Sequence, residues 1–68
     1  MEKTELFKQT KALAKQGYAD AQSVLGFIYK KGDVIEKDFQ EASKWFKKAA
    51  DQGHSVAKKE LLNREDWY

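Results

Sequence analysis

The sequence contains no cysteine and no proline, and only four of its 68 residues are glycine. Without cysteine, the chain has neither a disulfide to stabilise it nor a thiolate to bind a metal. The lack of proline and the scarcity of glycine favour long uninterrupted helices over a fold rich in loops. At this length we expect a single domain with a small core, which leaves a protein only marginally stable.

The sequence also lacks a large excess of charge of either sign and any long apolar run. Charged residues make up 35% of the chain, but the formal net charge is only +2, so the two signs are interspersed as on a solvated surface. So weak a basic balance does not indicate nucleic-acid binding. No apolar run is long enough to span a bilayer, and the first residues, Met-Glu-Lys-Thr-Glu, lack the pattern of a signal peptide. We therefore expect a cytoplasmic protein that makes no use of a membrane.

Apolar residues recur every three or four positions, which predicts an all-α fold of about four helices. The predicted helices run from 3 to 16, from 19 to 31, from an N-cap at Asp38 to Gly53, and from Ser55 into Asp66. Gly17 and Gly53 are predicted as left-handed caps. Glu41, three residues after Asp38, completes a capping-box pattern. The third helix therefore has the clearest predicted start.

Each predicted helix has one inward side. The first helix is expected to bury Leu6, Phe7, Thr10, Leu13 and Ala14. Gly26 lies inside the second helix, where glycine is less favourable than alanine by about 1 kcal/mol. We interpret it as a place where a neighbouring helix comes close, since small residues such as Ala42 and Ala49 also lie on the inward sides.

The chain repeats itself at an offset of about 36 positions, which indicates a helical repeat unit. Residues 14–17 read Ala-Lys-Gln-Gly, and residues 50–53 read Ala-Asp-Gln-Gly. The other matching pairs are Glu5 with Glu41, Lys8 with Lys44, Lys11 with Lys47, Ala21 with Ala57, and Leu25 with Leu61. Helical repeats stack to form binding surfaces, so the pattern favours binding over chemistry.

Two motifs carry a resemblance to a known family. They read Ala21-x-x-x-Leu25-Gly26-x-x-Tyr29-x-x-Gly32 and Asp38-Phe39-x-x-Ala42-x-x-Trp45-Phe46-x-Lys48-Ala49-Ala50-x-x-Gly53-x-x-x-Ala57. The chain resembles the Sel-1-like repeat family, which is related to the tetratricopeptide repeats. The resemblance implies an antiparallel helix-turn-helix repeat, a fragment of an α/α solenoid, with one full repeat at about 21–56 flanked by half repeats in a single domain, 1–68. It also implies a protein-binding role. Val34 stands where the family commonly has a second glycine.

The ends of the chain depart from the repeat. Leu62 replaces the glycine that matches Gly26, and Gln9 and Thr10 replace the aromatic residues that match Trp45 and Phe46. We interpret both ends as caps at which the array stops. The alternatives left open are a monomer and a homodimer, the latter formed through Leu62 and Trp67.

The candidate partner-binding residues form two groups. Asp20, Ser23, Phe27 and Lys31 share one side of the second helix, where Phe27 is either an aromatic anchor for a partner or a residue packed on the first helix. Leu62, Trp67 and Tyr68 form the second group, near the C-terminus. The two aromatic residues there either cover the last helix or form an aromatic hook for a partner.

No catalytic, cofactor-binding or metal-binding set is visible. His54 is the only histidine, and no base, nucleophile or group of converging ligands accompanies it. We therefore expect no enzyme, cofactor or metal, and instead a small protein-interaction module. An inhibitor, an immunity-type protein or a bacterial or phage-encoded antagonist fits this size. The alternatives are a structural subunit or adaptor of a larger assembly and, less favoured, a nucleic-acid-binding protein.

Overall fold

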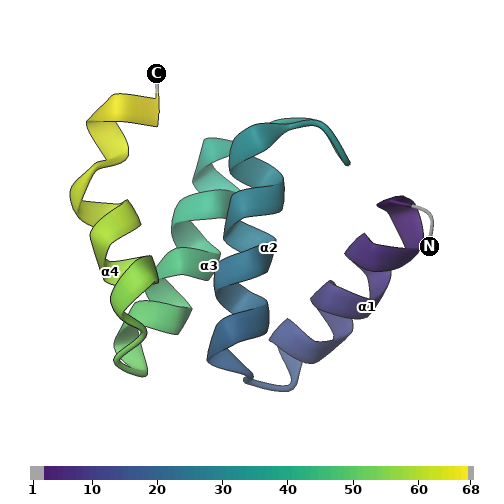
Figure 1. Ribbon diagram of the computed structural model, residues 1–68, viewed down its shortest axis with the longest axis horizontal. Coiled ribbons are helices and arrows are strands. Elements are labelled where there is room, and N and C mark those ends of the chain that lie inside the picture. Colours follow the sequence, from purple (N-terminus) through teal and green to yellow (C-terminus); the bar gives the residue numbers. More distant parts are fainter. Residues whose placement is uncertain (1–2, 68) are drawn as a thin grey trace.

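The computed structural model describes residues 3–67, which form four α-helices and a final 3₁₀ turn and contain no strand. The elements are α1 (Lys3–Lys15), α2 (Ala19–Lys31), α3 (Phe39–Asp51), α4 (Ser55–Leu62) and the 3₁₀ helix η1 (Arg64–Trp67). The predicted all-α fold is confirmed. The chain reverses direction at each turn, so that α2 and α3 lie side by side at the centre, with α1 against α2 and α4 against α3 (Figure 1).

The turns are formed as the glycines and Asp38 predict. Gly17 and Gly53, at equivalent repeat positions, have φ of 104° and 90°, in the left-handed region that a side chain disfavours. The Asp38 carboxylate accepts hydrogen bonds from the backbone N–H groups of Gln40 and Glu41, both at 3.1 Å. A capping box also requires the Glu41 side chain to accept from the Asp38 N–H, and this part of the prediction is wrong. The Asp38 N–H instead donates to the Tyr29 carbonyl at 3.0 Å. This bond ties the start of α3 to α2.

The core consists of two clusters on either side of the α2–α3 contact. The first contains Ala14, Ala21, Leu25 and Trp45, and the second contains Ala42, Phe46, Ala49 and Ala57. Tyr29 packs against both clusters. Burial raises the pKa of its phenol above the ordinary value of 10.0, and the negative charges of Glu41 and Asp38 raise it further. Tyr29 therefore joins the two clusters as an uncharged residue.

Gly26 is required by the close approach of α3, as its position inside a helix predicts. A Cβ at Gly26 would lie 2.9 Å from three atoms of the Phe46 ring. Phe46 is fully buried, so its ring has little room to move away. The missing side chain of Gly26 is what lets this aromatic residue enter between the helices.

Two of the sequence predictions need correction. Leu6 and Leu13 are about half exposed, at 46% and 45%, so α1 buries a narrower side than expected. The fourth helix ends at Leu62 and does not reach Asp66, because the chain turns there and brings Trp67 back onto α3. Among the described residues only glycines have positive φ, so Val34 does not adopt the left-handed turn of a glycine.

Candidate partner-binding site

The structure brings Phe27 and Trp67, one from each predicted group, into a single aromatic cluster around Phe46. The Phe27 ring meets the Phe46 ring edge to face, with centroids 5.0 Å apart, and the Trp67 ring lies 5.6 Å from the Phe46 ring. Lys30 Nζ lies 5.6 Å from the centroid of Phe27 and 5.5 Å from that of Trp67. The same Nζ forms an ion pair with Glu60 at 2.6 Å, which links α2 to α4. Phe27 thus packs on the third helix and not on the first.

The remaining residues of the two predicted groups lie in different surroundings. Ser23 is buried at 3% exposure, so its side chain is not on the surface, whereas Lys31 is exposed. Leu62 is 85% exposed, which makes it the most exposed large apolar side chain among the described residues. Tyr68 lies outside the described residues. Partner binding by these groups stays a prediction. Its accessible residues are Asp20, Lys31 and Leu62, which are exposed, and Phe27 and Trp67, which are partly exposed.

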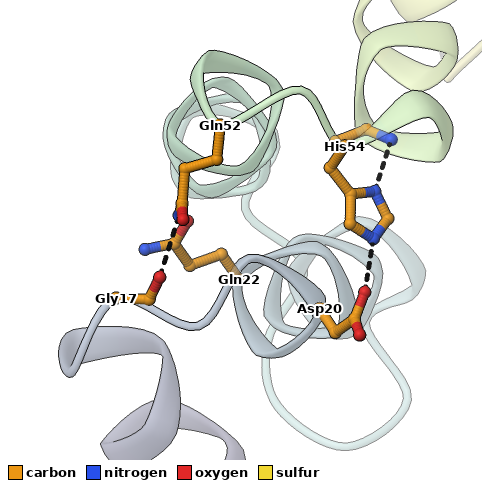
Figure 2. Close-up of polar contacts among 6 residues, drawn as sticks. Gly17, Asp20, Gln22, Gln52 and His54 are labelled. Atoms are coloured by element: carbon orange, nitrogen blue, oxygen red, sulfur yellow. Dashed lines mark hydrogen bonds and ion pairs between the residues drawn. The ribbon is translucent and has the colours of Figure 1, made fainter.

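Sequence reasoning missed a polar network that joins the two interhelical turns. Gln22, although buried, donates from Nε2 to the Ala14 carbonyl at 3.1 Å. Gln52 donates from Nε2 to the Gly17 carbonyl and to Gln22 Oε1, both at 2.9 Å. Figure 2 shows these side chains pointing toward one another across the turns. The network satisfies buried polar groups and fixes the repeat spacing, so we interpret it as structural.

His54 belongs to the same region and has a structural role as well. Its Nδ1 accepts a hydrogen bond from the Ala57 N–H at 3.2 Å and so caps α4. Its Nε2 lies 2.8 Å from Asp20 Oδ1 (Figure 2), which assigns the proton to Nε2 as the donor. The Asp20 side chain is 97% exposed. The pair therefore contributes little beyond orienting the ring.

A continuous groove runs along α3 beside α4 and η1, and we call it the α3–α4 groove. One part, of about 600 Å³, and a second, of about 540 Å³, share Gln40, Ser43 and Arg64 in their linings. The first part is completed by Phe39 and Glu65, and the second by Lys44, Lys47, Ala50, Asp51 and Leu61. Sequence reasoning did not select this groove. The repeat pairing of Leu61 with Leu25 was visible in the sequence. It points to a groove only once the structure shows that Leu25 contacts Trp45, because Leu61 then lies where a second tryptophan would bind.

Metal binding and membrane insertion each require a particular arrangement of residues. Within residues 3–67, no group of three or more histidine, cysteine, aspartate or glutamate side chains converges to hold a metal ion. No helix in that part of the chain is long and apolar enough to cross a membrane. The α3–α4 groove combines an apolar floor with a charged rim, which is the composition of a protein-binding surface.

The comparisons with known proteins agree with this geometry. No curated protein and no solved structure matches the chain significantly. The family model of the Sel1 repeat matches residues 19–54, just over half of the chain, which covers α2, the loop that follows it, α3 and the turn before α4. Sel1 repeats are non-catalytic and generally mediate protein–protein interaction. The chain belongs to the Sel1 repeat family.

Proposed function

We propose that this chain is a small protein-binding module that presents the α3–α4 groove to one partner protein. The observation that carries the proposal is the groove itself, which stays open along the whole of α3 in a member of a family of interaction repeats. We infer one full repeat with a half repeat at either end, and no helix of the described residues covers the side of α3 and α4 that carries the groove. We propose no catalytic activity, cofactor or metal for it.

A chain of this size acts by covering a surface of its partner, as an inhibitor or antagonist does. The principal axes of the described residues span 31, 26 and 16 Å, and a standard interface occupies about 800 Å² on each partner. One such interface takes up about a sixth of the 4676 Å² of accessible surface, roughly one broad face of the molecule. We infer masking of one partner at the groove, and the ternary-complex test below distinguishes it from bridging two proteins.

Binding can be tested by affinity capture from a lysate of the organism that encodes the chain, followed by titration calorimetry with the purified partner. We expect saturable binding at a ratio of one to one. The control is the variant Phe46→Asp, which places a charge in the core and unfolds the chain. Retention of the same proteins by the folded chain and by this control would refute the proposal, and a ternary complex with two partners would refute masking.

A second function, as a structural subunit, is favoured by one observation. Leu62 projects from the end of α4 with 85% of its surface exposed, as a docking residue in a larger assembly would. Sedimentation of the isolated chain over a range of concentrations tests the self-associating form of this alternative. A monomer at all concentrations would exclude self-association, and the structural role would then require Leu62 to dock on a different protein.

A further inference from the structure

Trp45 is the residue through which α3 packs on the helix pair that precedes it. Its ring is only 7% exposed and belongs to a cluster with side chains of α1 and α2. The floor of this site is formed by Ala14, Ala21 and Leu25, and Phe7 and Tyr29 border it. Phe7 and Tyr29 meet edge to face, with centroids 6.0 Å apart. The α1–α2 pair thus forms a defined site for one tryptophan carried by a neighbouring helix.

The internal repeat places two of the three floor positions in the α3–α4 groove. Ala50 and Leu61, which line the groove, are the repeat equivalents of Ala14 and Leu25. Ala57, the equivalent of Ala21, is fully buried in the neighbouring core and does not line the groove. The space that Trp45 fills between α1 and α2 therefore has a counterpart between α3 and α4 that no side chain of the described residues fills.

The border of the groove differs from that of the Trp45 site. Ser43, the repeat equivalent of Phe7, lines the groove, and Glu65 of η1, beyond the end of α4, lines its first part. A small hydroxyl takes the place of one aromatic ring and a carboxylate lies nearby, so the groove has polar edges where the Trp45 site has aromatic ones. Such a surface suits reversible binding better than permanent burial.

We propose that the α3–α4 groove binds one amphipathic helix of a partner protein, which places a tryptophan or another large aromatic side chain against Ala50 and Leu61. The partner helix lies on α3 and α4 as α3 lies on α1 and α2. This inference rests on the proposed function and adds the chemistry of the partner. Aromatic residues inserted into such sites are the usual source of binding free energy at interfaces.

The charges around the groove define the rest of the partner helix. Lys44, Lys47 and Arg64 line the second part of the groove against a single acidic residue, Asp51. Lysine and arginine side chains at the rim of an interface select acidic partners and speed their association. The partner helix therefore carries glutamate or aspartate residues beside its aromatic anchor.

A second copy of this chain lacks the required chemistry. Its α1 would present Gln9 and Thr10 where α3 has Trp45 and Phe46. Lys8 and Lys11 of the same helix would approach a basic groove, which is unfavourable. A different protein is therefore the occupant, and self-association is an outcome that the test can detect.

Leu62 sets the number of aromatic residues that the groove can accept. It stands at the repeat position of Gly26, where the missing side chain makes room for the Phe46 ring. A leucine there occupies the place of a second ring. The groove thus takes one aromatic anchor, and the exposed Leu62 side chain contacts a small residue that follows it.

The probe for this proposal is a peptide built on α3 itself. It spans residues 38–52 and carries Lys44→Glu, Lys47→Glu, Lys48→Glu and Phe46→Ala, so that it keeps Trp45 on an acidic helix with no second ring. Its matched control carries Trp45→Ala in addition. Both are titrated into the whole ¹⁵N-labelled chain, up to millimolar concentration, and followed by heteronuclear NMR.

We expect saturable shifts at the amides of Ala50, Leu61 and Arg64, and binding at least about tenfold weaker for the peptide without tryptophan. In the labelled chain, Lys47→Glu should weaken binding of the probe several-fold. Lys58→Glu makes the same charge change at an exposed α4 position that does not line the groove, and should leave binding unchanged. Arg64→Glu repeats the test at a second rim position if Lys47→Glu perturbs the fold.

Three results would overturn the proposal: no shifts in the groove at millimolar peptide, equal binding by both peptides, or shifts centred on Ala14 and Leu25. The last would mean that the probe displaces α3 from its own site. A partner captured from lysate separates this proposal from the general function. If that partner binds equally well to the wild type and to Lys47→Glu, and the probe does not compete with it, the chain is still a binding module but the groove is not its site.

Discussion

Replacing Gly26 by alanine tests whether the close packing of α2 on α3 decides the stability of this fold. Alanine in a helix interior is favoured over glycine by about 1 kcal/mol, which would stabilise the variant if nothing else changed. The new Cβ would lie 2.9 Å from three atoms of the Phe46 ring, well inside normal contact. The ring is held on its other sides by Phe27 and Trp67, at centroid distances of 5.0 and 5.6 Å. Overpacking of this kind destabilises a core by about 1–3 kcal/mol.

We therefore expect Gly26→Ala to lower the free energy of unfolding by about 1 kcal/mol, the balance of the two effects. In a chain of this length this corresponds to a loss of roughly 4–8 °C in Tm, measured by circular dichroism. The matched variant is Gly26→Ala in a Phe46→Leu background, where the smaller side chain leaves room for the methyl group and the alanine should become neutral or stabilising. A variant Gly26→Ala that is more stable than the wild type, or an alanine effect that is the same in both backgrounds, would refute the steric argument.

Three further substitutions probe the cap, the shared tyrosine and the C-terminal turn. His54→Ala removes the cap on α4 and should lower the free energy of unfolding by about 1 kcal/mol, while His54→Asn keeps a capping oxygen and stays within a few tenths in thermal unfolding. The pKa of Tyr29 is raised in the folded state, so the stability that its neutral phenol contributes is fully present below pH 10 and is lost as the pH rises from there through the folded pKa. The stability of Tyr29→Phe relative to the wild type should therefore increase above pH 10 in urea unfolding, and a difference that stays constant with pH would contradict the assignment. Trp67 Nε1 is buried without a hydrogen-bond partner among the described residues, so Trp67→Phe should stay within about 1 kcal/mol of the wild type, whereas Trp67→Ala should lose more, about 2–3 kcal/mol, by chemical denaturation.

The helices and their order were predictable because the signals for them are local. The spacing of apolar residues gave α2 its bounds, and Gly17, Gly32 and Gly53 supplied left-handed caps at the turns. The role of Gly26 was also predictable, since a glycine inside a helix has few explanations other than close packing. Family membership followed from the same residues, which are fixed by repeat packing.

The candidate site was much less predictable, because it depends on which surfaces meet. Phe27 was predicted either to anchor a partner or to pack on the first helix, but the C-terminal turn and α3 enclose it against Phe46. Leu13 matched the apolar period of α1 and is half exposed, because no helix of the described residues covers that side of α1. The interhelical partners of His54 and Gln52 lie 30 to 35 residues away in sequence and leave no local pattern.

The two mismatches at Leu62 and Thr10 gain a different meaning from the structure. As sequence differences they were interpreted as separate caps. The contact between Gly26 and Phe46 shows that these two repeat positions face each other, so a change at one alters what the other can accept. A helix placed on α4 must therefore carry a residue smaller than phenylalanine at the position that faces Leu62.

We infer that the α3–α4 groove repeats part of the Trp45 site and accepts an aromatic side chain from a partner helix. Intermolecular nuclear Overhauser effects between the indole protons of the acidic probe and the isotope-labelled chain would locate this side chain. We expect contacts from the indole ring to the methyl groups of Ala50 and Leu61. Contacts to Ala14 and Leu25 instead, or a bound indole with no contact to the groove, would contradict it.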